Sequence, residues 1–110
     1  MYRKTRLMID NIRKRVEDGD YALTIHGFER CVMRNISPDE IRCVILSGEI
    51  IEDYPKDKYG PSCLICGSTE KGRILHVQCS IDPVWIITAY DPTLNPEEWG
   101  KNFKRRRIKS

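Results

Sequence analysis

The spacing of apolar residues changes at Gly48, and this change limits the folds that the chain can adopt. Before Gly48, apolar side chains recur about every fourth residue, as Met8, Ile12 and Val16 do, which predicts helices. After Gly48 they recur every second residue, which predicts strands. Helices followed by strands that are joined through short turns indicate an α+β fold, with N-terminal helices packed on one face of a mainly antiparallel sheet.

Three helices are expected before Gly48. The second covers about residues 26–35, with Phe28, Val32 and Met33 on one face. The third begins at Ser37 as the N-cap residue and has a glutamate three positions later, which completes a capping box. Four strands follow, at about residues 49–54, 62–68, 73–81 and 84–91.

The length of 110 residues allows one domain, which we place at residues 1–100, followed by a basic C-terminal tail at residues 101–110. Charge is uneven: residues 1–15 hold six Lys/Arg and one Asp, residues 101–110 hold six Lys/Arg and no acid, and the remainder holds seven Lys/Arg and fifteen acids. The basic ends indicate contact with phosphate, or simply solvated segments. The apolar run behind the basic N-terminus is too short for a signal peptide, so we expect a cytoplasmic protein.

Five cysteines in a chain without a secretion signal indicate reduced thiols. Cys63 and Cys66 have a spacing found in zinc sites, but no second cysteine or histidine pair completes a set of four ligands. The two residues also lie three apart in an expected strand, so their side chains should face opposite sides. We expect no metal and no cofactor.

The strand at 73–81 carries an apolar face and a polar face, and the polar face includes His76. The pairing register of the next strand decides which of its residues join each face. In one register, Trp85 and Ile87 are buried beside the apolar face of the previous strand, which consists of Leu75, Val77 and Cys79. Thr88 and Tyr90 then lie beside His76. In the other register, the two faces of the later strand are exchanged. We favour the first, because it buries more apolar area. His76 would then be a near neighbour of Tyr90, or else only a half-exposed residue on a solvated sheet face.

His26 and Arg30 are four residues apart and share one helical face. Because both side chains can be cationic, their pairing is mildly indicative of an anion site. A helix-capping or surface role for His26 is the plainer alternative.

Six segments in order resemble one family, the small bacterial domain of unknown function numbered forty-two fifty-eight. They are His26-x-x-x-Arg30, Ile36-Ser37, Gly48 to Pro55, Gly60 to Leu64, Gly72 to Val77 and Ile87 to Tyr90. The resemblance covers about residues 5–100. It implies a fold like that of the RelE and barnase-like toxin nucleases, and a metal-independent ribonuclease activity. It also implies an antitoxin partner protein of the zinc-ribbon type. The positions that match the family are His26, Arg30, Ser62, His76, Thr88 and Tyr90.

An RNA 2′-hydroxyl can attack its own adjacent phosphate when a base, an acid and a cation are supplied. We expect His26 and His76 to be the base and acid, in either order, because imidazole titrates near neutral pH. Arg30 would hold the phosphate, Tyr90 would orient it or stack on a base, and Ser62 and Thr88 would contact the substrate. The basic residues of the tail, which are Lys104, Arg105, Arg106 and Arg107, would add affinity for RNA.

Two other functions fit the same sequence. The chain could bind nucleic acid without cutting it, or bind only a protein through its acidic body. The ribonuclease requires His26, Arg30, His76 and Tyr90 to meet in one cleft, whereas neither alternative does.

Overall fold

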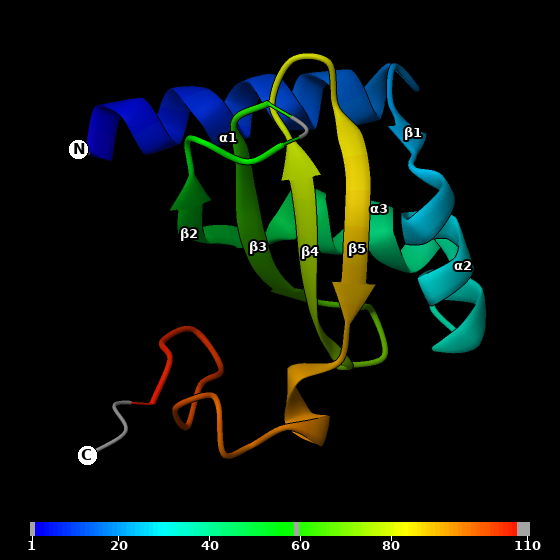
Figure 1. Cartoon of the computed structure of the whole chain (residues 1–110), viewed down its shortest axis with the longest axis vertical. Coiled ribbons are helices and arrows are strands. Elements are labelled where there is room, and N and C mark those ends of the chain that lie inside the picture. Colours follow the sequence, from blue (N-terminus) through cyan, green and yellow to red (C-terminus); the bar gives the residue numbers. More distant parts are fainter. Residues whose placement is uncertain (1, 59, 108–110) are drawn as a thin grey trace.

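The computed structural model describes residues 2–58 and 60–107. It contains three helices, a five-stranded sheet and one short 3-10 helix (Figure 1). The helices are α1 (Tyr2–Glu17), α2 (Ile25–Met33) and α3 (Pro38–Ser47). The strands are β1 (Ala22–Leu23), β2 (Glu49–Tyr54), β3 (Ser62–Ser68), β4 (Ile74–Ser80) and β5 (Trp85–Tyr90), and the 3-10 helix is η1 (Pro92–Leu94). The α+β class is confirmed.

The helix boundaries follow local chemistry. Ser37 accepts a hydrogen bond from the backbone amide of Glu40, and the Glu40 side chain accepts one from the Ser37 amide. This capping box satisfies two amides that would otherwise lack partners at the start of α3. The helix ends at Ser47, before Gly48, as the sequence predicts.

The sheet has the order β1-β5-β4-β3-β2, so it is five-stranded and mixed rather than four-stranded. β2 to β5 are antiparallel, as expected, whereas β1 pairs in parallel with β5. β1 contains only Ala22 and Leu23, held by backbone hydrogen bonds such as that from the Thr24 amide to the Ile86 carbonyl, 3.0 Å. Two residues are too few to show the alternating pattern of a strand. β1 is therefore visible only from its pairing with β5 and not from the sequence.

The core lies between one sheet face and the helices α1 and α3. α3 passes behind the strands in Figure 1, and α2 lies beside β5. The expected apolar faces of β4 and α3 are buried there, together with one face of α1: Ile9, Ile12, Val16, Ile41, Val44, Ile45, Leu75, Val77 and Cys79. In the described part of the chain, no helix is long and apolar enough to cross a bilayer.

Only the C-terminal end of β5 pairs with β4 in the register that the sequence favoured. Tyr90 pairs with His76 and Thr88 with Gln78, which places both beside the polar face of β4. A bulge after Gln78 then shifts the register, so that Ile86 pairs with Cys79. The prediction that Trp85 and Ile87 are in the core is therefore wrong. Trp85 is 39% exposed and Ile87 is only half-buried, whereas Ile86 is fully buried between them. A bulge adds one residue to one strand and so exchanges its two faces.

Candidate functional site

The end of the chain packs against one end of the second face of the sheet. Residues 92–107, orange to red in Figure 1, lie below the strands, beside the end of the sheet where β4 begins and β5 ends. A backbone bridge between Trp99 and Arg106 and a 2.7 Å hydrogen bond from the Gly100 amide to the Arg105 carbonyl give the segment its shape. Residues 101–107, which were predicted to be part of a basic tail, are thus packed against the domain. We call residues 99–107 the C-terminal cover.

His76 lies beneath this cover and is fully buried. Its ring contacts Trp99 edge-on, with the ring centroids 4.4 Å apart. Its Nε2 lies 2.6 Å from the carbonyl oxygen of Phe103, and its Nδ1 lies 3.2 Å from the hydroxyl oxygen of Tyr90. The alternative of a half-exposed histidine on a solvated face is wrong, because the cover excludes water from it.

These contacts determine the protonation of the His76 ring. A carbonyl oxygen only accepts, so Nε2 carries the proton and donates it to Phe103. Burial lowers the pKa of His76, and this outweighs the hydrogen bond to Phe103, which raises it. In the neutral ring, Nδ1 accepts from the Tyr90 hydroxyl. Burial in turn raises the pKa of Tyr90 to about 12, so the phenol keeps its proton at neutral pH.

Ion pairs fasten the cover to β2. Arg106 donates to both carboxylate oxygens of Glu52, at 2.7 and 3.1 Å, and its guanidinium carbon lies 4.6 Å from the centre of the Trp99 ring. Tyr54 donates a hydrogen bond to the same carboxylate. Burial alone would raise the pKa of Glu52, but the hydrogen bonds from Arg106 and Tyr54 lower it overall. Lys104 pairs with Glu49 at 2.9 Å.

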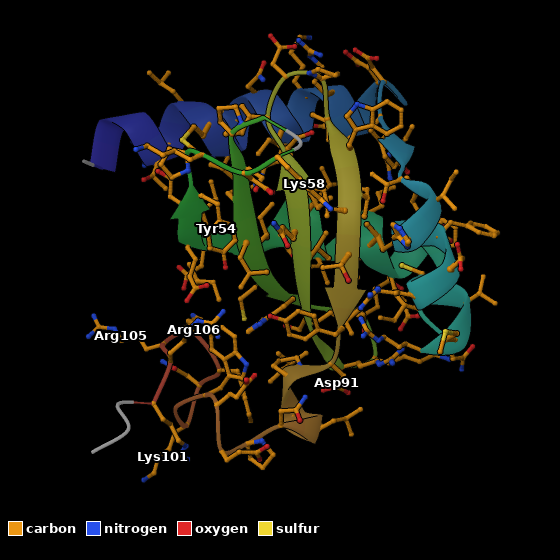
Figure 2. All side chains as sticks on the ribbon, in the orientation of Figure 1. Tyr54, Lys58, Asp91, Lys101, Arg105 and Arg106 are labelled. Atoms are coloured by element: carbon orange, nitrogen blue, oxygen red, sulfur yellow. The ribbon has the colours of Figure 1, made fainter. Side chains whose placement is uncertain are left out.

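The four basic residues predicted to contact RNA therefore differ in their surroundings. Lys104 and Arg106 already have acidic partners on β2. Arg107 donates to the carbonyl oxygen of Pro96, 2.8 Å, and is exposed. Arg105 is exposed, and Figure 2 shows its side chain directed away from the sheet, whereas Arg106 points toward the strands.

A pocket of about 580 Å³ opens beside the cover, between the end of α2, the end of β5 and η1. Four arginines and two acids line it, with one tyrosine and one threonine. The lining residues are Arg30, Met33, Arg34, Arg73, Thr88, Tyr90, Asp91, Leu94, Asn95, Glu98 and Arg106. We call this the arginine pocket. Its excess of guanidinium groups over carboxylates makes it attractive to anions.

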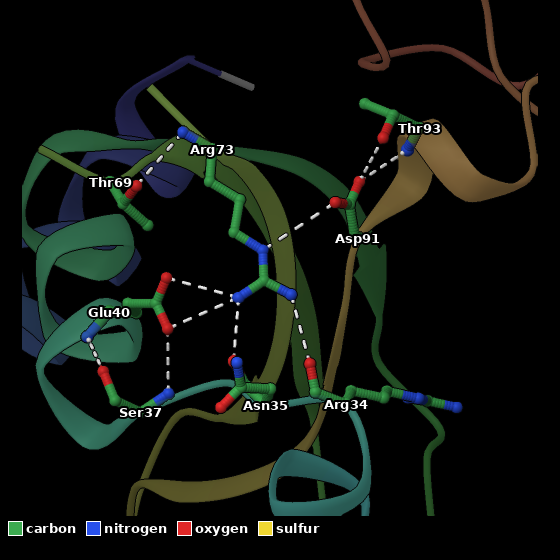
Figure 3. Close-up of polar contacts among 8 residues, drawn as sticks. All are labelled: Arg34, Asn35, Ser37, Glu40, Thr69, Arg73, Asp91 and Thr93. Carbon is green, nitrogen blue, oxygen red and sulfur yellow. Dashed lines mark hydrogen bonds and ion pairs between the residues drawn. The ribbon is translucent and has the colours of Figure 1, made fainter. Parts of the chain in front are cut away.

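Its arginines are held to different extents. Arg73 is fixed: it donates to the carbonyls of Arg34 and Asn35 and pairs with Glu40 and Asp91 (Figure 3). Arg34 donates to the carbonyl of Ala89 at 2.8 Å. In residues 2–58 and 60–107, the guanidinium of Arg30 has no hydrogen-bond or ionic partner. Arg30 is therefore available to an incoming anion.

The structure brings some of the predicted site residues together and separates others. Arg30, Thr88, Tyr90 and Arg106 line the arginine pocket. His26 is exposed in the first turn of α2 and is not part of the lining, and His76 lies behind Tyr90. The acid–base pair expected from the sequence is therefore not assembled in this pocket.

Ser62, expected to contact substrate, is fully buried. Its hydroxyl donates to the carboxylate of Asp57, 2.7 Å, and accepts from Gln78, 3.2 Å. These bonds tie the β2–β3 connection to the sheet. Ser62 thus has no free hydroxyl for a substrate in this structure.

Cys63 and Cys66 face opposite sides of β3, as predicted. Cys63 pairs with Cys79 on the core face, and Cys66 pairs with His76 on the covered face. In the described residues, no three His, Cys, Asp or Glu side chains are grouped as a metal site would require.

Sequence reasoning missed Arg34, Arg73, Asp91 and Trp99. Arg34 follows Arg30 by four residues and could have been found by helical spacing. Arg73 and Asp91 come from the ends of two strands, and Trp99 from the cover, so only the folded chain shows that they belong to the site.

A family model matches residues 23–91 of the chain, which is more than half of it; its description is "Domain of unknown function (DUF4258)". The chain belongs to this family. Comparisons with curated proteins and with solved structures give no match. The match contains α2, all of β2 to β5 and Tyr90, but it ends before η1 and the C-terminal cover. The cover is thus a feature of this chain outside the matched region.

Proposed function

We propose that this DUF4258 protein is a metal-independent endoribonuclease of the toxin type, and that it binds the RNA backbone in the arginine pocket. The observation that carries the proposal is the position of Tyr90. Its ring lines a pocket that also contains Arg30 and Arg34, and its hydroxyl is hydrogen-bonded to a buried, neutral imidazole.

The arginines would bind the phosphate. A guanidinium group presents paired N–H donors that match two phosphate oxygens, and its charge does not titrate near neutral pH. Arg30 has no competing partner in the described residues, and Arg34 retains free N–H groups beyond its bonds to β5. Both would also stabilise the extra negative charge of the phosphorane.

Tyr90 and His76 would accept the proton. As the 2′-hydroxyl passes its proton to the Tyr90 oxygen, the phenolic proton moves to Nδ1 of His76. The 2′-oxygen bonds to phosphorus, the bond to the 5′-oxygen breaks, and that oxygen takes a proton from water. The hydroxide left by this water takes a proton from Tyr90, which regains its own proton from His76, so that both side chains return to their neutral forms. The products are a 2′,3′-cyclic phosphate and a 5′-hydroxyl. His76 is then a positioning residue and proton acceptor that never touches RNA.

The test is incubation of the purified protein with single-stranded RNA in EDTA, with mapping of cyclic phosphate ends. Tyr90→Phe should slow cleavage by about 10²–10⁴-fold and leave RNA affinity nearly unchanged. His26→Ala is the matched control and should cut at the wild-type rate. Wild-type cleavage by Tyr90→Phe would refute the mechanism.

RNA binding without cleavage is the second candidate. The observation in its favour is that both nitrogens of His76 are engaged beneath the cover, which opposes proton transfer. RNA that binds in the arginine pocket but is not cleaved would support this candidate.

The exposed Arg105 and Arg107 would add contacts to the RNA backbone. Each phosphate contact contributes about 0.7 to the log–log salt slope, so replacing both with alanine should flatten the slope by up to about 1.4.

The rest of the toxin assignment belongs to the same proposal. Kinship with the RelE and barnase-like nucleases is supported by the order of helices before a mainly antiparallel sheet. A cytoplasmic location follows if cellular RNA is the substrate. An antitoxin of the zinc-ribbon type is supported by the family resemblance alone.

A further inference from the structure

Glu52 in β2 holds an arginine that belongs to the arginine pocket. Arg106 lines this pocket, whereas Glu52 does not. Nε and Nη2 of Arg106 donate to the two carboxylate oxygens of Glu52, at 2.7 and 3.1 Å, and this pairing does not use Nη1. A guanidinium has more N–H groups than one carboxylate can accept. Arg106 can therefore donate to a phosphate in the pocket while it stays paired with Glu52.

The backbone of β2 is shaped so that Glu52 faces this site. β2 pairs regularly with β3 up to Ile50, but a bulge at Ile51 shifts the register, and Glu52 pairs with Leu64. Leu64 pairs in turn with Gln78, which lies on the polar face of β4. Without the extra residue, Ile51 would take this place and Glu52 would point into the core. Bulges redirect side chains in this way and are common next to active sites.

Further contacts fix the orientation of both side chains. Tyr54 donates a hydrogen bond to the carboxylate of Glu52, whose side chain is only 21% exposed. The guanidinium carbon of Arg106 lies over the buried ring of Trp99, 4.6 Å from the ring centre. One edge and one face of this guanidinium are thus held before any ligand binds. An arginine that is fixed in this way loses less side-chain entropy on binding than a free one.

We propose that Glu52 is a positioning residue of the phosphate site. It does not touch the ligand, but it holds Arg106 at the wall of the pocket, where Nη1 donates to the phosphate that Arg30 binds. This inference rests on the phosphate binding proposed above, and it adds Arg106 to Arg30 and Arg34 as a ligand of the phosphate. It also makes the C-terminal cover part of the binding site, because Arg106 belongs to the cover.

Simple electrostatics gives the opposite expectation for Glu52. A carboxylate near an anion site repels the anion, so removal of its charge should strengthen binding. If Glu52 positions Arg106, its loss should weaken binding instead, because the guanidinium is then free to turn away from the pocket. A third explanation is that the ion pair only fastens the cover. In that case the other ion pair of the cover, between Lys104 and Glu49, should matter equally.

The probe is a fluorescein-labelled tetranucleotide of 2′-O-methyl RNA, whose methylated 2′-oxygens cannot attack the phosphate. Fluorescence anisotropy in EDTA measures its affinity for the full chain over a range of salt concentrations. Glu52→Gln should weaken binding by about 3–10-fold and flatten the log–log salt slope by about 0.7, the contribution of one phosphate contact. In the Arg106→Gln background, Glu52→Gln should cause no further weakening, because its effect passes through Arg106. Arg106→Lys keeps the charge but not the planar fork, and should also bind more weakly.

Glu49→Gln is the matched control. It removes the same charge from the same strand and releases Lys104 from its ion pair with β2, but neither of these two residues lines the arginine pocket. Its affinity for the probe should not fall below that of the wild type. Circular dichroism checks that each variant is folded. Tyr54→Phe serves as the second variant if Glu52→Gln does not fold: it keeps the ion pair, removes one hydrogen bond from Glu52, and should weaken binding to a smaller extent.

The outcomes distinguish this inference from the proposed function. If Arg30→Gln weakens binding of the probe while Glu52→Gln strengthens it or leaves it unchanged, the pocket binds phosphate but Glu52 does not position Arg106. Equal weakening by Glu49→Gln would assign the effect to the cover as a whole and would also overturn the positioning role. If the wild-type protein does not bind the probe, the phosphate site itself is wrong, and this inference fails with it.

Discussion

The hydroxyl of Tyr90 donates a hydrogen bond to Nδ1 of His76, 3.2 Å away, at a point where the imidazole is closed off from water by the C-terminal cover. The two residues are direct partners on β4 and β5. The second ring nitrogen donates to Phe103, so His76 joins the matched family core to a segment outside it. This contact relates the stability of the cover to the protonation of a single ring.

The stability of the protein should depend on pH through His76. Burial lowers the pKa of His76 in the folded state, so between its unfolded and folded pKa values the unfolded chain binds more protons. The contribution of neutral His76 to the unfolding free energy is then fully present above about pH 6.5. It is lost as the pH falls below that value, by up to about 1.4 kcal/mol per pH unit. Urea unfolding from about pH 7 to about pH 5 should show a steeper loss for the wild type than for His76→Gln. His26 is present in both proteins, so it does not contribute to the difference between them. Parallel curves of unfolding free energy against pH for the two proteins would contradict the expectation.

Arg106→Ala should loosen the C-terminal cover. The substitution removes both hydrogen bonds to Glu52 and the contact with the Trp99 ring. Because the pair is partly exposed, we expect a loss of only about 1 kcal/mol in unfolding free energy. Amide hydrogen exchange at residues 99–107 should accelerate more than exchange in β4. Arg105→Ala is the matched control, and exchange as fast as in Arg106→Ala would show that the ion pair is not what holds the cover.

Arg73→Ala should destabilise the end of α2. Arg73 donates to the carbonyls of Arg34 and Asn35, which follow the helix, and pairs with Glu40 in α3 (Figure 3). Because both carbonyls are exposed, water can bind them after the substitution, so we expect a loss of about 0.5–1.5 kcal/mol in unfolding free energy. Chemical denaturation measures the change, with the exposed Lys71→Ala as control. Equal stability of the two variants would mean that water replaces the guanidinium.

Gly27→Ala should disturb the packing of α2 on β5. The added carbon would lie 2.4 Å from the Ile86 carbonyl oxygen and 3.1 Å from that of Ile87, and neither backbone atom moves freely. Although alanine favours helices, we expect a net loss of about 1–3 kcal/mol. Glu29→Ala, on the exposed side of the same helix, should change stability little. A gain in melting temperature for Gly27→Ala would show that α2 can shift outward without cost.

Cys43 should be the thiol that reacts first with an alkylating reagent. It is partly exposed, whereas the other four cysteines are buried. Burial also raises the pKa of Cys31 and Cys66, which lowers their thiolate fraction at neutral pH. Mass spectrometry of the native protein should find the first label on Cys43.

The expected absence of zinc stays a prediction, and elemental analysis that finds one zinc per chain would contradict it.

Local patterns predicted much of the fold because they depend on neighbouring residues. The capping box at Ser37, the end of α3 before Gly48 and the alternation of β4 each need only a few adjacent positions. The pairing of Tyr90 with His76 was favoured by an estimate of buried apolar area, although that estimate counted Trp85 as buried and the bulge exposes it. The strand bounds of β2 and β3 follow from the change of period and the turn residues around them.

The sequence by itself thus determined the α+β class, the helices and the polar face of β4, and it favoured the pairing of that face with Tyr90 without deciding it. Only the tertiary structure decided what covers that face, because residues 99–107 return through long-range contacts such as Arg106 with Glu52. The bulge in β5 and the exposure of Phe28 and Val32 on α2 were likewise decided by packing. Periodicity records which residues share a face, but the partner of that face depends on where distant segments come to rest.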